Sequence, residues 1–121
     1  MNFFRKLFAS PFVAVFWLVV VAVLSLLPGD DIPRWDIPYL DKYVHVMMYA
    51  GISFLWGNVF GFRFRPRKLL QKLTLLLLAS LSYGLLMEIL QQTIAVHRAF
   101  DWLDMAANAA GSITGILFAL I

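Results

Sequence analysis

Four long apolar stretches constrain this chain more than any other feature of its sequence. They cover about residues 8–27, 41–60, 72–93 and 101–121, and each is close to the roughly 20 residues that a helix needs to cross a bilayer. The chain has 121 residues, of which 62% are hydrophobic. A soluble domain of this size has too little interior to bury so much apolar surface. We therefore predict a single all-α domain over residues 1–121, an integral membrane four-helix bundle.

The basic residues predict the orientation of this bundle. Those on one side of the spans are Arg5, Lys6, Arg63, Arg65, Arg67, Lys68 and Lys72, and those on the other are Arg34, Lys42 and Arg98. Basic residues concentrate in cytoplasmic loops, so we expect both termini in the cytoplasm and a multi-pass protein of the bacterial cytoplasmic (inner) membrane. Leu27 is a poor residue before a signal-peptide cleavage site, so the first span is expected to stay uncleaved.

The composition also excludes several classes of function. The chain has no cysteine, which excludes disulfides, thiolate catalysis and cysteine-based metal sites. The net charge is +3, but the basic residues lie beside apolar spans and suit anionic lipid. We therefore predict the lipid bilayer as a partner and no binding of nucleic acid.

Polar side chains recur at helical spacing at the outer ends of three spans. Contact between such polar stripes and lipid costs free energy, so they should face the interior of the bundle. We predict that they converge on one pocket open to the outside. The expected ligand-binding residues are Asp41, Lys42, His45, Tyr49, Glu88, Gln91, Arg98, Asp101, Asp104 and Asn108.

Glu88 is the most informative of these residues because its neighbours on both sides are apolar. An ionised side chain at the centre of a span costs about 2.5–3.5 kcal/mol on insertion scales. Glu88 should therefore be either protonated or paired, with His45, Lys42 or Arg98 as candidate partners. A structural ion pair between helices and a functional group both fit this pattern.

His45 fits three roles, as a proton carrier, a metal ligand or a hydrogen-bonding strut. Together with Glu88 and Asp104 it has donor atoms suited to Zn²⁺ or Mn²⁺. The chain has no H-E-x-x-H motif, however, so we predict no metal site and no cofactor.

The outer link and the start of the last span carry two further candidates. Arg98 suits a phosphate or carboxylate head group, but interfacial anchoring or pairing with Asp101 fits equally. Asp101 itself suits the N-cap of the last helix. Asp104 lies too deep for capping, and Asn108 suits a hydrogen bond between helices.

Small residues predict close packing of helices. Gly111 and Gly115 form a G-x-x-x-G motif within the last span, and Gly84 lies in the third. Such glycines allow the backbone of a neighbouring helix to approach closely. In a four-span bundle that neighbour belongs to the same chain, so the motif does not by itself imply a dimer.

In these features the chain resembles the VanZ-like family of small membrane proteins. The resemblance covers most of the chain, from about residue 24 to residue 115. The matching residues are Asp41-Lys42-Tyr43-Val44-His45 with Tyr49, then Tyr83-Gly84 with Glu88 and Gln91, then Arg98, Asp101, Asp104, Asn108 and Gly111. The resemblance implies an outer site facing cell-wall precursors or their analogues, and an accessory role in resistance to glycopeptide antibiotics such as teicoplanin.

Three functions fit the sequence. In the first, the pocket binds the head of a lipid-linked envelope precursor without catalysis, and Lys42 and Arg98 meet an anion. In the second, the protein is an intramembrane enzyme on a lipid head group, in which Glu88 and His45 form an acid–base pair and Asp104 orients the histidine. In the third, it is a small proton-coupled transporter, although the inner halves of the spans carry no charge. We favour the first function.

Overall fold

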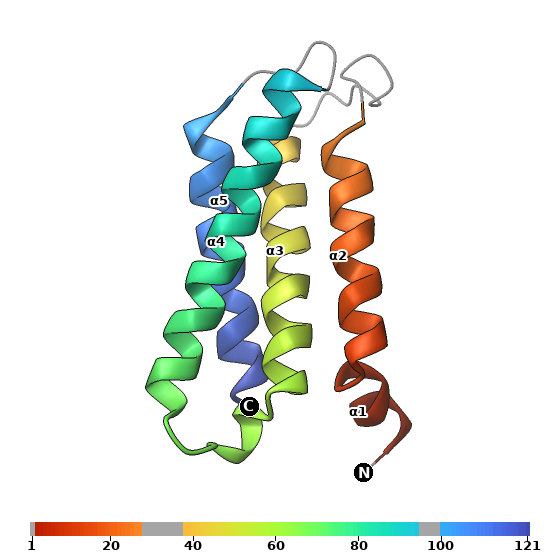
Figure 1. Cartoon of the computed structure of the whole chain (residues 1–121), viewed down its shortest axis with the longest axis vertical. Coiled ribbons are helices and arrows are strands. Elements are labelled where there is room, and N and C mark those ends of the chain that lie inside the picture. The colour runs from red at the N-terminus through yellow and green to blue at the C-terminus, as the bar shows by residue number, and fades with distance from the viewer. Residues whose placement is uncertain (1, 28–37, 95–99) are drawn as a thin grey trace.

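The computed structural model describes residues 2–27, 38–94 and 100–121, and within these ranges the chain forms helices and no strand (Figure 1). The all-α prediction is therefore confirmed. The helices are α1 (Phe3–Phe8), α2 (Pro11–Ser25), α3 (Leu40–Val59), the short 3₁₀ helix η2 (Phe62–Phe64), α4 (Leu69–Thr93) and α5 (Trp102–Ala119).

The sequence left the start of the first span open between about Leu7 and Phe12. In the structure the chain breaks after the short helix α1, and α2 begins at Pro11, which agrees with the later of these starts. Proline suits the first position of a helix, because its missing N–H would have no partner there and its φ is already helical. The N-terminal helix α1 is capped separately, by the Asn2 side chain accepting from the Arg5 amide at 3.0 Å.

Among the described helices, α4 alone is long and apolar enough to cross a membrane by length and composition. Helix α2 is apolar but has only 15 residues. Acidic, amide and small residues on their inner faces lower the hydropathy of α3 and α5. Length and composition therefore support a membrane association through α4. The argument for four spans depends on how the helices pack.

Helix α3 lies at the centre of the bundle and contacts α2, α4 and α5 (Figure 1). Its closest neighbour is α5, which crosses it at the two glycines of the G-x-x-x-G motif. A Cβ atom at Gly111 would overlap the backbone carbonyl oxygen of Val46, and one at Gly115 would overlap that of Ala50. The two backbones therefore touch, and the motif serves a contact within the chain.

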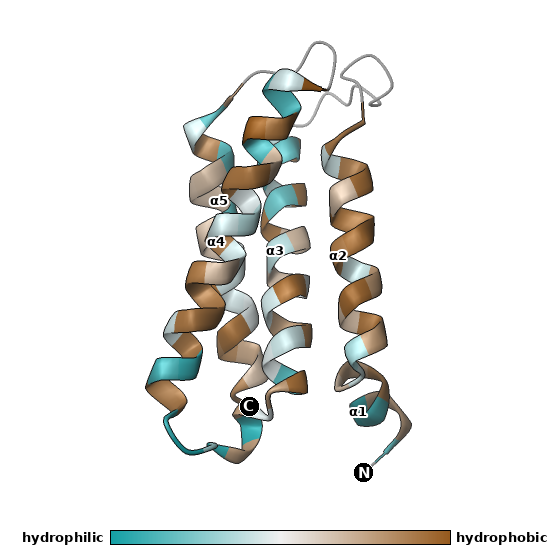
Figure 2. Ribbon diagram, viewed as in Figure 1, coloured by the Kyte–Doolittle hydropathy of each residue, from teal (hydrophilic) through white to brown (hydrophobic). Residues whose placement is uncertain are grey.

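The bundle buries two apolar clusters and several polar side chains, and it leaves many large apolar side chains exposed. Large apolar side chains cover its outer faces, for example Phe12, Leu70 and Ile121, which are 87%, 78% and 80% exposed. In Figure 2 the hydrophobic colour accordingly dominates the ribbons of α2 and much of α4. The buried polar residues are Ser25, His45, Ser53, Ser80, Glu88, Gln91, Asp104, Asn108 and Ser112.

Candidate functional site

Most of the predicted polar residues gather at one end of the bundle, where α3 and α5 begin and α4 approaches its end. This end lies away from both chain termini, which share the opposite end (Figure 1). His45, Glu88, Asp104 and Asn108 are between 1% and 7% exposed. Three helices thus bring polar side chains from distant parts of the sequence into a shared interior.

Lys42 forms ion pairs with three carboxylates at this end of the bundle. Its ammonium group donates to Asp41 at 2.6 Å, to Asp101 at 2.5 Å and to Asp104 at 2.7 Å. The side chains become less exposed with depth, from 63% at Asp41 and 40% at Asp101 to 10% at Asp104. Lys42 therefore acts here as an internal counter-ion that joins α3 to the start of α5.

Asp101 has the predicted N-cap role for α5. One carboxylate oxygen accepts from the Leu103 amide at 2.9 Å, and the other accepts from Lys42. Asp101 precedes the first residue of the helix. The hydrogen bonds from Lys42 and from the Leu103 amide lower the pKa of its carboxyl group, so Asp101 is ionised at neutral pH and holds Lys42.

Below Lys42, His45 lies between α4 and α5. Its Nδ1 is 2.8 Å from the Asn108 side-chain oxygen. An amide oxygen can only accept a hydrogen bond, so Nδ1 carries the proton. The other ring nitrogen, Nε2, faces Asp104 Oδ2 at 3.7 Å, and donor atoms of His45, Glu88 and Asp104 all lie within 4.8 Å of one another. The three residues proposed for an acid–base site are therefore neighbours.

Other predicted site residues lie around this cluster. Gln91 donates to the Ser25 carbonyl oxygen at 2.7 Å and so links α4 to α2. Tyr49 is buried in the apolar core next to the cluster. A Cβ atom at Gly84 would lie 2.7 Å from Asn108 Nδ2, so this glycine makes room for the amide that holds His45. Arg98 lies outside the described residues, and its contact with a head group stays a prediction.

Sequence reasoning missed three polar contacts that join the helices. The Ser80 and Ser112 hydroxyls are 2.6 Å apart, between α4 and α5. Tyr83 donates to the Leu18 carbonyl oxygen at 2.6 Å, and Trp17 donates to that of Met48 at 2.9 Å, so both anchor α2. For one of these contacts the sequence offered a signal. Ser112 lies between Gly111 and Gly115 of the motif, which places its hydroxyl on the face of α5 that packs against other helices.

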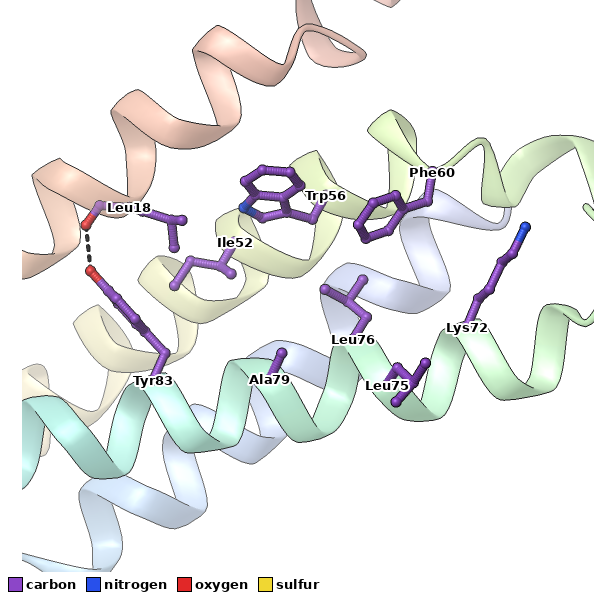
Figure 3. A pocket seen from close by; sticks show the side chains of 9 residues that line it. All are labelled: Leu18, Ile52, Trp56, Phe60, Lys72, Leu75, Leu76, Ala79 and Tyr83. Carbon is purple, nitrogen blue, oxygen red and sulfur yellow. Dashed lines mark hydrogen bonds between the residues drawn. The ribbon is translucent and has the colours of Figure 1, made fainter.

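Two cavities lined by described residues lie away from the polar cluster. The larger, of about 580 Å³, is apolar and lies among α2, α3 and α4 (Figure 3). Trp56, Phe60 and Tyr83 line it, and Lys72 stands at one end. The smaller, of about 310 Å³, lies beside Arg5 and Arg63 at the opposite end of the bundle from the cluster. Neither cavity is lined by a predicted ligand-binding residue.

Comparison of this chain with protein-family models, with curated proteins and with solved structures gives no match. Its chemistry is therefore argued from the cluster itself. Carboxylate and amide oxygens there accept hydrogen bonds, the ring nitrogens of His45 can donate or accept them, and the carboxylates can attract a cation.

Proposed function

We propose that this protein is a four-span membrane protein of the VanZ-like type, in the bacterial cytoplasmic membrane with both termini in the cytoplasm. The exposed apolar side chains and the buried polar groups support this proposal, because apolar outer faces and polar side chains turned inward suit lipid as the solvent. The spans are α2, α3, α4 and α5. At 1.5 Å per residue, the 20 residues of α3 extend about 30 Å, the thickness of a bilayer's hydrocarbon core.

The proposed orientation predicts which end of α4 is accessible from outside the cell. Gln71 and Gln92 are exposed residues near its two ends, and the chain has no native cysteine. In intact cells, a membrane-impermeant maleimide should label Gln92→Cys, whereas it should label Gln71→Cys only after permeabilisation. The unmodified chain is the blank. Labelling with the reverse preference would overturn the orientation.

We further propose that the polar cluster binds the sugar or peptide part of a lipid-linked envelope precursor or of a glycopeptide-type ligand. The observation that carries this is the convergence of acceptor groups from three helices, graded from exposed Asp41 to buried Glu88. Because three carboxylates already hold Lys42, the cluster favours ligands that donate hydrogen bonds through hydroxyl, amide or ammonium groups. This replaces the expectation that Lys42 contacts an anion of the ligand.

A complementation experiment in the native host tests this function. Deleting the gene should change the pool of lipid-linked envelope precursors or the sensitivity to teicoplanin, and the wild-type gene should restore both. Glu88→Gln should fail to restore them at equal membrane levels, because it removes the buried carboxylate while keeping its shape. Gln71→Ala, at the other end of α4, is the matched control and should restore both. Full rescue by Glu88→Gln would argue that Glu88 serves only packing.

One observation favours a second candidate, an enzyme that acts on the same head group. Asn108 fixes the tautomer of His45, so that Nε2 faces Asp104 within a buried group that includes Glu88. A positioned histidine nitrogen of this kind suits a general base. Mass spectrometry of envelope lipids incubated with purified protein would detect turnover. Turnover that persists in the double variant Glu88→Gln, His45→Ala would exclude this candidate.

A further inference from the structure

The described part of the polar cluster holds more negative than positive charge. Its carboxylates are Asp41, Glu88, Asp101 and Asp104, and its one described cationic side chain is Lys42. Two groups of these residues bring their donor atoms within 4.8 Å of one another. In the outer group, formed by Asp41, Asp101 and Asp104, the Lys42 ammonium is already bound to all three carboxylates.

The inner group consists of His45, Glu88 and Asp104, one from each of α3, α4 and α5. All three side chains are buried, at 6%, 1% and 7% exposed. One imidazole nitrogen and two carboxylates form the mixed donor set that first-row divalent cations such as Zn²⁺ and Mn²⁺ accept.

The separation of His45 and Asp104 suits a bridging ion better than a direct hydrogen bond. Nε2 and Oδ2 are 3.7 Å apart, beyond the 2.7–3.2 Å typical of a hydrogen bond between nitrogen and oxygen. Two ligands at about 2.1 Å from a tetrahedral metal lie about 3.4 Å from each other. The observed distance is therefore within a few tenths of an ångström of the spacing around a metal.

The residues behind these ligands also have the arrangement found around metal sites. Asn108 accepts from Nδ1 of His45 at 2.8 Å, which leaves the lone pair of Nε2 directed toward Asp104. Lys42 donates to the other oxygen of Asp104, Oδ1, at 2.7 Å, and so leaves Oδ2 for an ion. Metal-binding histidines and carboxylates are typically held by outer partners in this way.

We propose that His45 Nε2, Asp104 Oδ2 and a carboxylate oxygen of Glu88 bind one divalent cation of the Zn²⁺ or Mn²⁺ type. This assignment reverses the sequence-based prediction of no metal. That prediction relied on ligand spacing along the chain, whereas here each ligand comes from a different helix. The proposal stands apart from the proposed function, because a bound cation is measurable without any envelope ligand.

Titration calorimetry on the purified full chain, carrying a tag without histidine and stripped with EDTA, tests the site. We expect one equivalent of Zn²⁺ to bind, Mn²⁺ to bind more weakly, and Mg²⁺ to bind most weakly, because imidazole favours the later transition metals. Co²⁺ should produce visible absorption bands from inner-sphere coordination, and Zn²⁺ should abolish them. Detergent micelles without protein give the blank.

Variants then connect the binding to the three ligands. Glu88→Gln and His45→Gln should each weaken Zn²⁺ binding at least about tenfold, and Asn108→Ala should weaken it about 10–100-fold through loss of the outer hydrogen bond. Gln71→Ala, at the other end of α4 from the cluster, is the control and should leave the affinity within twofold. Circular dichroism of each variant separates lost binding from lost folding.

Several outcomes would overturn the proposal. These are the absence of saturable binding by the folded wild type, equal affinity in Glu88→Gln and in Gln71→Ala, and Mg²⁺ binding as tight as that of Zn²⁺. If the wild type binds no metal while Glu88→Gln still fails to complement the deletion, the proposed function survives and the metal site does not.

Discussion

Replacing Gly115 with alanine should destabilise the protein by about 2–3 kcal/mol, at the upper end of the range for overpacking. Helix propensity alone predicts the opposite, a gain of up to about 1 kcal/mol. The contact decides the sign, because the added Cβ would overlap the Ala50 carbonyl oxygen and lie 2.9 Å from the Phe54 amide nitrogen. Backbone atoms cannot turn aside as a side chain does, so α5 must move away from α3.

Equilibrium unfolding in mixed micelles, followed by circular dichroism, measures this loss. Gly111→Ala should destabilise the protein by a similar amount, because its Cβ would overlap the Val46 carbonyl oxygen. Ala110→Val is the control, since Ala110 is exposed on the same helix and the change should cost less than about 1 kcal/mol. A stabilised Gly115→Ala protein would show that α3 and α5 are not in backbone contact.

Replacing Lys42 with methionine should destabilise the protein by about 3 kcal/mol. Removal of one partner of a buried ion pair leaves an uncompensated charge, at a cost of about 3–5 kcal/mol. The lower value is expected because Asp41 and Asp101 are partly exposed, at 63% and 40%, and retain contact with water. Most of the loss should come from Asp104, whose side chain is 10% exposed.

A double-mutant cycle in the same unfolding assay isolates this contribution. Asp104→Asn removes the buried charge while keeping the shape, so adding it to Lys42→Met should restore more than about 1 kcal/mol. Asp41→Asn, added to Lys42→Met instead, removes an exposed charge and should restore much less. Equal effects of the two additions would mean that the ion pair with Asp104 carries no special share of the stability.

Much of the helical framework follows from local patterns in the sequence. Apolar runs interrupted by the segment around Gly61 and by the links between the runs place the longer helices, because each helix needs its own continuous run of suitable residues. Helical periodicity also assigns Asp104, Asn108 and Gly111 to one face of α5. The separate helix α1 was not predicted, because its 6 residues are too few to show a periodic pattern.

The grouping of the site residues required the tertiary structure. Local periodicity shows which face of a helix is polar, but it does not set the rotation or axial shift of that helix against its neighbours. Those are determined by close contacts between distant residues, such as Gly115 against Ala50. Local patterns in the sequence are thus enough to predict the helices, their apolar outer faces and the end at which their polar residues gather. The packing of α3, α4 and α5 is what brings Lys42 to three carboxylates and His45 to Glu88 and Asp104. These contacts join residues far apart in the sequence, so they depend on the rotation and axial shift of each helix against its neighbours.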